Sequence, residues 1–212
     1  MARKPGDRNR DFEKKREQIL DILELRVIQE DGHRLSMNEM AQAADVSLST
    51  LRHHLGSREE LLKALLERQG SRGERYLALV TAEPTTGLDE SLRSTLHQVV
   101  IGLEHGLAET LAHGLSVGLR DRTVGPAFLN NLLEPIQQSL ELRLKHHQRR
   151  GELVDADLRV AALTLLAPVV LGALHQRGLC GNEVRPLSLH ALVDEQVTRF
   201  VRAYAPAATA AG

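Results

Sequence analysis

The chain has 212 residues, enough for one or two small domains with a buried core. Its 27 Lys and Arg residues balance 28 Asp and Glu residues, so the net charge of the whole chain does not indicate nucleic-acid binding. Any basic surface for a nucleic acid must therefore be local. Scarce aromatic residues and a single cysteine, Cys180, exclude a stacking platform for single-stranded nucleic acid and an internal disulfide.

The first predicted element is a helix from about Asp11 to Glu30, with Ile19, Leu23 and Val27 on one face. Residues 1–16, which lead into it, carry a net charge of +4. This basic arm is either a segment that neutralises phosphates or a solvated charged face, and composition alone leaves both open.

Residues 36–61 predict two short helices separated by a tight turn. Ser36 and Glu39 form a capping box for a helix that begins at Met37. Ser47 can cap the next helix, whose inner side carries Leu51 and Leu55. This is the helix-turn-helix pattern, in which the second helix enters the major groove of DNA.

A third helix is predicted to begin directly after this pair. Ser57 and Glu60 form its capping box, and Arg58 lies in its first turn. A cation is unfavourable at the positive end of a helix dipole, so Arg58 is expected to serve another purpose, such as a phosphate contact.

Residues 36–66 resemble the amino-terminal signature of the TetR (tetracycline-repressor-like) family of transcriptional regulators. Four positions depart from it: Arg52 stands where the family usually has Tyr, Leu55 where it has Phe, Arg58 where it has Lys, and Asp45 where it favours Gly. Leu55 keeps apolar volume, both arginines can meet a phosphate, and Asp tolerates left-handed backbone.

The resemblance implies an all-α fold with a three-helix DNA-binding domain followed by a larger helical domain for effector binding and dimerisation. The implied boundaries are 1–67 and 68–204, with a disordered tail at 205–212. The residues implied to contact DNA are Ser36, Ser47, Leu48, Ser49, Thr50, Arg52, His53, His54 and Arg58. Leu48 also suits the core, and His54 also suits packing against a neighbouring helix.

Helical spacing continues through the second half of the chain. The helix opened by Ser57 is expected to run toward Val80, with a kink or break at Gly70 and Gly73. One helix is predicted over 88–113, and another runs from Gly125 through Leu144 with a bend at Pro135. The sequence 114–118 matches G-x-S-x-G, the nucleophile elbow of serine hydrolases, but helical spacing precedes it where that motif needs a strand.

The last two predicted helices carry the expected dimer interface. Apolar residues surround the helix at 158–174, and a second apolar stripe begins at Leu189. Paired with their twofold copies they would form a four-helix interface, as in the resembled family; an ordinary monomer core is the alternative. The interface residues predicted are Leu158, Ala162, Leu165, Val169, Ala173, Leu192, Val193, Val197 and Phe200.

The resemblance also implies a small-molecule pocket in the larger domain. The candidate residues are His97, Ile101, His105 and His113. His105, Glu109 and His113 share one helical face if the helix is continuous, a spacing that also suits a metal, although no complete ligand set is visible. No cofactor or metal is therefore predicted, and polar contacts to an effector are the preferred interpretation.

The predicted function is a homodimeric repressor that binds a palindromic operator in double-stranded DNA and is released by a small-molecule effector. A helix-turn-helix activator, an effector-independent DNA binder and, remotely, a serine hydrolase are the alternatives. The chain is expected to be cytoplasmic, with no membrane association, because the start lacks a signal peptide and the apolar run from Val160 to Leu174 has 15 residues, too few to span a bilayer.

Overall fold

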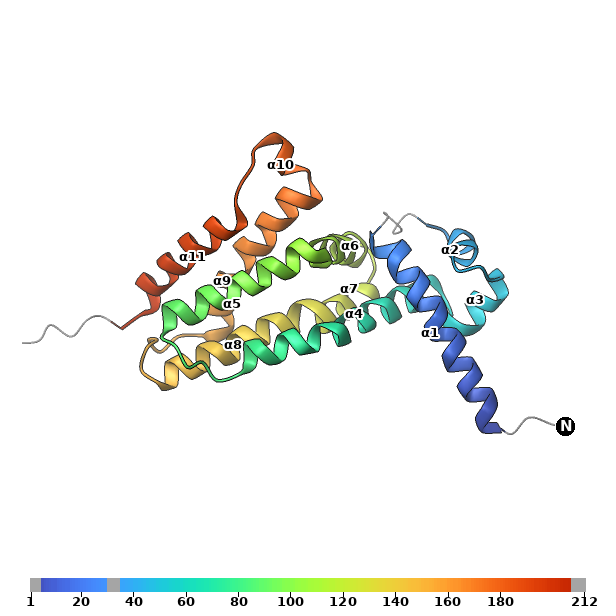
Figure 1. Cartoon of the computed structure of the whole chain (residues 1–212), viewed down its shortest axis with the longest axis horizontal. Coiled ribbons are helices and arrows are strands. Elements are labelled where there is room, and N and C mark those ends of the chain that lie inside the picture. The colour runs from blue at the N-terminus through green and yellow to red at the C-terminus, as the bar shows by residue number, and fades with distance from the viewer. Residues whose placement is uncertain (1–4, 30–34, 207–212) are drawn as a thin grey trace, which may run out of the picture. The chain divides into compact units, whose positions relative to one another are not determined.

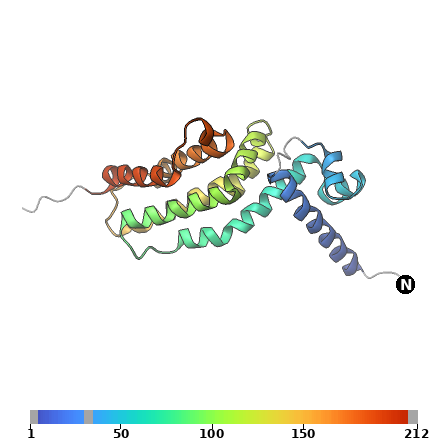
Figure 2. The same cartoon turned by 45° about the horizontal axis from the view of Figure 1, so that its top comes forward.

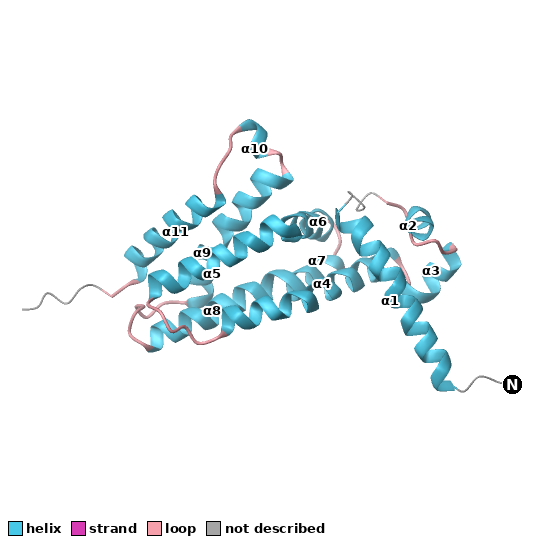
Figure 3. Ribbon diagram, viewed as in Figure 1, coloured by secondary structure: helices cyan, strands magenta, loops and turns pink. Residues whose placement is uncertain are grey.

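A computed structural model describes residues 5–29 and 35–206 of the chain. Within these ranges all regular structure is helical and there is no strand, which confirms the predicted all-α class (Figure 3). The chain divides into two compact units, Met1–Ser71 with His113–Asn131, and Arg72–Ala112 with Leu132–Gly212. The expected division at residues 67 and 68 is close to Ser71, but the first unit also takes in residues 113–131. Most of the expected tail, 207–212, lies outside the described residues.

The first unit holds the long helix α1 (Pro5–Gln29), the pair α2 (Met37–Ala43) and α3 (Leu48–Leu55), the start of α4 (Arg58–Thr81), the end of α6 (Ala108–Gly118) and the short α7 (Val124–Phe128) (Figure 1). Its core is largely aliphatic. Fully buried side chains from four helices meet there: Ile19, Leu20, Leu23, Met40, Leu51, Leu61 and Leu62.

The G-x-S-x-G sequence lies within helix α6, not on a strand-to-helix turn. A Cβ added at Gly114 would lie 2.1 Å from the Phe128 ring, and one added at Gly125 would lie 2.7 Å from the Gly118 carbonyl oxygen. The two glycines of the motif therefore let α6 and α7 approach closely, while Ser116 between them is exposed. Helix packing accounts for the spacing, and the strained turn that a nucleophile elbow requires is not formed.

The second unit is a bundle of α5 (Leu88–Gly102), α8 (Glu134–Arg149), α9 (Leu158–Ala173) and α11 (Leu189–Tyr204), with the one-turn helix α10 (Gly181–Val184) before α11. Helix α5 lies along α11, and α8 lies along α9 (Figures 1 and 2). Two π-helical segments belong to this unit, η2 (Leu103–Leu107) and η4 (Leu174–Gly178), and a third, η3 (Leu129–Leu133), precedes α8.

Two helix predictions were wrong. Helix α4 continues through Gly70 and Gly73 without a break. Gly70 serves close packing, because a Cβ there would lie 2.6 Å from the Asn131 carbonyl oxygen. The helix predicted over 88–113 is interrupted in η2, where His105 has φ −108° and Gly106 has φ 107°, a left-handed conformation that suits glycine. Pro135 lies in the first turn of α8, a position that tolerates proline.

Helices α9 and η4 form one continuous segment, Leu158–Gly178, of 21 residues with mean hydropathy 1.8. By length and composition alone it is long enough to cross a membrane, so the expectation that this run is too short was wrong. Its buried residues, among them Leu165 and Val169, pack against α8 and α11. The segment is thus a core helix of the second unit, with part of its circumference left uncovered.

A buried polar network joins α5 to the end of α8. Arg143 Nη1 donates to Ser91 Oγ at 2.9 Å, and Arg143 Nε donates to the Val80 carbonyl at 2.9 Å. His147 is fully buried, with Nδ1 2.7 Å from Glu152 Oε2 and Nε2 2.9 Å from Ser91 Oγ. Since an ionised carboxylate only accepts, Nδ1 carries the proton and the Ser91 hydroxyl donates to Nε2. Burial lowers the pKa of His147, more than Glu152 raises it.

This lowered pKa predicts acid sensitivity. In the unfolded chain His147 binds a proton below the ordinary histidine pKa of about 6.5. In the folded chain it binds that proton only at a lower pH, because its pKa is lowered. Stability at this site is complete above the unfolded pKa and is lost as pH falls from there toward the folded pKa. The urea concentration at the unfolding midpoint should therefore decrease as the pH is lowered from about 7.5 to about 5.5.

The matched variant is His147→Gln, which keeps a donor and an acceptor but does not titrate. It should be less stable at neutral pH and lose less of its urea midpoint over the same pH interval. An equal loss in both proteins would show that His147 is not the group responsible.

Candidate nucleic-acid interface

The predicted caps of the helix-turn-helix are confirmed by hydrogen bonds. Ser36 N donates to Glu39 Oε2 at 2.7 Å and Glu39 N donates to Ser36 Oγ at 3.3 Å, the reciprocal capping box. Thr50 N donates to Ser47 Oγ at 3.1 Å, so Ser47 is the N-cap of α3. Asp45 has φ 51°, the left-handed backbone expected there. The turn between α2 and α3 is therefore fixed by local chemistry.

Three hydroxyl groups gather at the first turn of α3. Ser47 Oγ lies 2.8 Å from both Ser49 Oγ and Thr50 Oγ1. The amino-terminal end of a helix offers free N–H groups and a positive partial charge, which favour a phosphate. The first turn of α3 therefore combines hydroxyl groups with the helix N-terminus, a chemistry that favours a phosphate.

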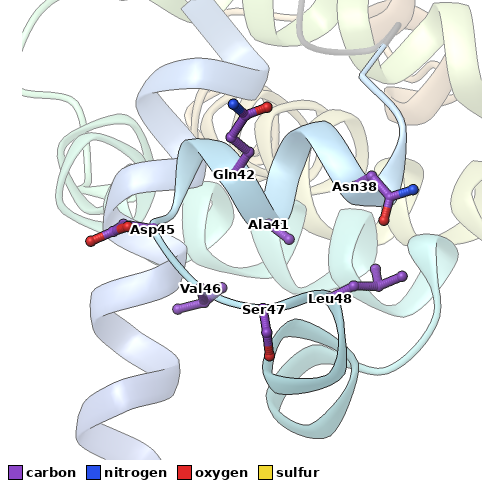
Figure 4. Close-up of a pocket in the computed structure, with 7 residues that line it drawn as sticks. All are labelled: Asn38, Ala41, Gln42, Asp45, Val46, Ser47 and Leu48. Atoms are coloured by element: carbon purple, nitrogen blue, oxygen red, sulfur yellow. The ribbon is translucent and has the colours of Figure 1, made fainter.

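An open hollow separates α2 from α3 at the turn (Figure 4). Asn38 and Gln42 line it from α2, and half-buried Leu48 lines it from α3. The Asp45 carboxylate points away from Leu48 (Figure 4). Leu48 thus belongs partly to the packing between the two helices, one of the two roles left open for it.

The faces of α3 follow from helical geometry. Leu51 and Leu55 are buried, while Ser49, Arg52 and His53 are exposed. At about 100° per residue, His53 lies opposite the buried leucines and Ser49 shares its face, whereas Arg52 lies on a flank. A helix in the major groove turns its outer face to base edges and its flanks to the sugar–phosphate walls. Arg52 is therefore placed for a phosphate.

His54 packs inside the first unit, the alternative to DNA contact left open for it. Its ring stacks on Phe12 of α1, with centroids 4.4 Å apart and an interplanar angle of 29°. Burial is the main cause that lowers the pKa of His54, followed by the positive charge of His53 and Lys15. His54 is thus a contact between α1 and α3. The contact between Phe12 and His54 was not predicted, because no sequence pattern around Phe12 indicates it.

Arg58 lies at the start of α4 and interacts electrostatically with Asp121 in the loop between α6 and α7. The Asp121 carboxylate accepts from Val124 N at 3.0 Å and Thr123 N at 2.7 Å, and these backbone bonds are the main reason that its pKa is lowered. Asp121 was also missed, although an acid just before a helix is a capping signal. The loop and α4 are thereby joined within the first unit.

The four predicted effector residues are divided between the two units. His113 belongs to the first unit, and the other three belong to the second. His97 is bound to α11, with Nε2 3.0 Å from Asp194 Oδ1 and Nδ1 2.7 Å from His190 Nδ1. Ile101 and His105 are exposed, and the kink at His105 breaks the face that His105, Glu109 and His113 were expected to share. The described residues hold no group of three or more metal-ligating side chains.

The residues predicted for the dimer interface mostly face the chain's own core. Seven of them are buried within the chain: Ala162, Leu165, Val169, Ala173, Val193, Val197 and Phe200. Leu158 and Leu192 are half-buried. A helix that is apolar all round gives no sign of its inward side. The uncovered side of α9 instead presents Val160, Leu163, Ala167 and Leu171.

Residues 103–206 match a family model described as the carboxyl-terminal domain of AefR-like transcriptional repressors. No curated protein sequence matches the chain. Several solved structures share its fold. A putative TetR-family transcriptional regulator from Mesorhizobium loti is 18% identical, with a TM-score of 0.74, 92% of this chain covered and 98% of that one.

Two further structures carry information on ligands. The flavonoid-responsive regulator FrrA is 21% identical, with a TM-score of 0.68 and coverage of 92% of this chain and 99% of its own. SmeT, the repressor of the Stenotrophomonas maltophilia multidrug efflux pump SmeDEF, is 21% identical, with a TM-score of 0.63 and 91% of each chain covered. SmeT is also solved as a complex with triclosan.

The flank position of Arg52 predicts a sequence-independent contribution to DNA binding. Arg52→Ala should weaken binding to a duplex of random sequence and reduce the slope of log K against log salt by about one unit. Arg58→Ala should also weaken binding and reduce this slope. Its effect should be smaller than that of Arg52→Ala, because Arg58 also interacts with Asp121.

Arg199→Ala is the matched control, because it removes one exposed charge from α11 in the second unit. It should leave the salt slope unchanged, as read by fluorescence anisotropy over a salt series. An unchanged slope in Arg52→Ala would contradict the phosphate assignment.

Proposed function

The chain belongs to the TetR family of transcriptional regulators, and we propose that it is a ligand-responsive repressor that binds a palindromic operator as a homodimer. The observation that carries the proposal is the capped α2–turn–α3 unit, with a hydroxyl cluster at the first turn of α3 and an outer face free of carboxylates. Two such units in a twofold dimer would read successive major grooves about 34 to 36 Å apart. As a DNA-binding regulator it would act in the cytoplasm.

The dimer is supported by the uncovered face of α9. Leu163 is 51% exposed and Leu171 is 68% exposed, and both lie on a helix that is apolar around nearly its whole circumference. Burying a leucine side chain contributes about 1.5 to 3 kcal/mol, so leaving this stripe in water is costly. A second copy of the same stripe, flanked by α11 from each chain, would cover it in a four-helix arrangement.

Effector binding is assigned to the second unit, which the family model largely covers. Its interior is built from aliphatic side chains, including Leu96, Val100, Leu103 and Leu140. The neighbouring regulators include one that responds to flavonoids and one solved with triclosan. By analogy, the effector of this chain is a small and mainly apolar molecule. It would act by favouring a dimer state in which the two copies of α3 have the wrong spacing.

The function is tested by selecting genomic fragments bound to the purified protein and then screening small apolar compounds for release. We expect a small set of fragments that share a palindrome, and at least one compound that lowers the affinity more than tenfold. Reading the occupied sites against promoter positions separates repression from activation. Binding without any sequence preference would contradict the operator, and a full screen without release would favour an effector-independent binder.

The dimer is tested by light scattering on wild-type protein and charged variants. The wild type should have twice the chain mass of 23.4 kDa. Leu163→Glu and Leu171→Glu should give monomers at micromolar concentration, because each places a charge in the proposed apolar contact.

Leu119→Glu is the control, since Leu119 is 83% exposed and belongs to the first unit, not to α9. It should stay dimeric. A wild-type mass of one chain, or dimers that persist in both α9 variants, would contradict the proposed interface.

A further inference from the structure

Three aromatic rings form a cluster between α1 and α3, the Phe12–His53–His54 cluster. Phe12 stacks on His54, and its ring meets the edge of His53 at a centroid distance of 5.4 Å and an angle of 89°. The two imidazoles are themselves edge to face, 5.2 Å apart. The orientation of the exposed His53 ring is therefore set by two neighbours, one of them from another helix.

Phe12 itself contributes little to the core. It is half-buried, whereas the fully buried side chains of α1, Ile19, Leu20 and Leu23, lie two to three turns further along the helix. Its ring contacts are the two imidazoles of α3. The position of Phe12 therefore serves the surface of α3 more than the interior of the unit.

His53 occupies the centre of the outer face of α3. It lies two residues from each of the buried leucines Leu51 and Leu55, about 200° around the helix from both. Ser49, four residues earlier, shares this face. When α3 lies in a major groove, His53 and Ser49 face the base edges.

The chemistry of this face favours one base. No Asp or Glu occurs from Val46 to Arg58, so the face offers hydrogen-bond donors and no competing carboxylate. An imidazole N–H donates in the neutral and the charged state. In the major groove guanine presents two acceptors, N7 and O6, whereas adenine presents one acceptor beside a donor. A donor placed toward O6 therefore favours guanine over adenine, whose N6 amino group is a donor at that position.

We propose that His53 donates a hydrogen bond to a guanine in each half-site, and that Phe12 is the positioning residue that holds the His53 ring for it. The inference rests on the proposed function, since it assumes that α3 enters a major groove. An exposed histidine held by two edge-to-face contacts loses less side-chain freedom on binding than a free one. Phe12 thus improves discrimination between bases more than it improves overall affinity.

The test uses the wild-type full-length protein and its selected operator. Each guanine of one half-site is replaced in turn by 7-deazaguanine, which lacks N7, or by 2-aminopurine, which lacks O6. One guanine should show a loss of affinity of about fivefold to tenfold, the value of one hydrogen bond. In His53→Ala that penalty should vanish, because the donor is gone.

Phe12 is tested by the same guanine penalty, the ratio of the affinities for the unmodified and the modified duplex. A merely structural role of Phe12 would not change this ratio. Phe12→Leu, checked for an unchanged thermal midpoint, should reduce the penalty at least by half, and Phe12→Tyr, which keeps the ring, should restore it. Arg52→Ala is the contrasting variant: it should weaken binding to modified and unmodified duplexes equally and leave the ratio intact.

The outcomes distinguish a failure of the proposed function from a failure of the roles of His53 and Phe12. A wild-type protein that selects no sequence overturns the proposed function. A protein that selects an operator but keeps the full guanine penalty in His53→Ala overturns the role of His53. A penalty lost in His53→Ala but unchanged in Phe12→Leu overturns the positioning role of Phe12.

Discussion

The attachment of α1 to α4 is the contact on which the DNA-binding unit depends. Arg68 of α4 donates to three carboxylates of α1: its Nε lies 3.0 Å from Glu24 Oε2, and its terminal nitrogens bind Glu17 and Asp21. Glu24 is buried, so its charge requires this partner. The three acids occupy successive turns of α1, and the ion pairs therefore fix both the rotation and the axial position of the helix.

The position of α1 also determines which of its residues contact α3. With α1 held by Arg68, Phe12 lies beside His53 and His54 of α3. The aliphatic core under α2 and α3 holds the two helices together, but an aliphatic contact is non-directional and tolerates rotation. The ion pairs of Arg68 and the rings around Phe12 are directional contacts that α1 makes with α4 and α3.

Most of the local structure could be predicted from the sequence, and most long-range pairing could not. The capping boxes at Ser36 and Ser57 and the left-handed Asp45 depend on residues a few positions apart, so their pattern is visible in the chain. The inward side of α9 depends on which neighbours cover it, and an all-apolar helix leaves no amphipathic trace of that choice. The left-handed Gly106 and the close-packed Gly70 look alike in sequence, since both are glycines in helical runs, and only the tertiary structure separates a kink from a close approach.

The departures from the family pattern at Arg52 and Leu55 have different consequences for the same helix. Leu55 is buried and keeps the apolar contact that an aromatic residue would otherwise make, so the fold is retained with a smaller side chain. Arg52 lies on an exposed flank, where its permanent charge would meet the DNA backbone and strengthen binding without selecting a base. If affinity is supplied from the flank, selectivity falls to the outer face, where Ser49 and His53 remain. The histidine that α1 orients is then the residue of α3 best able to distinguish one sequence from another.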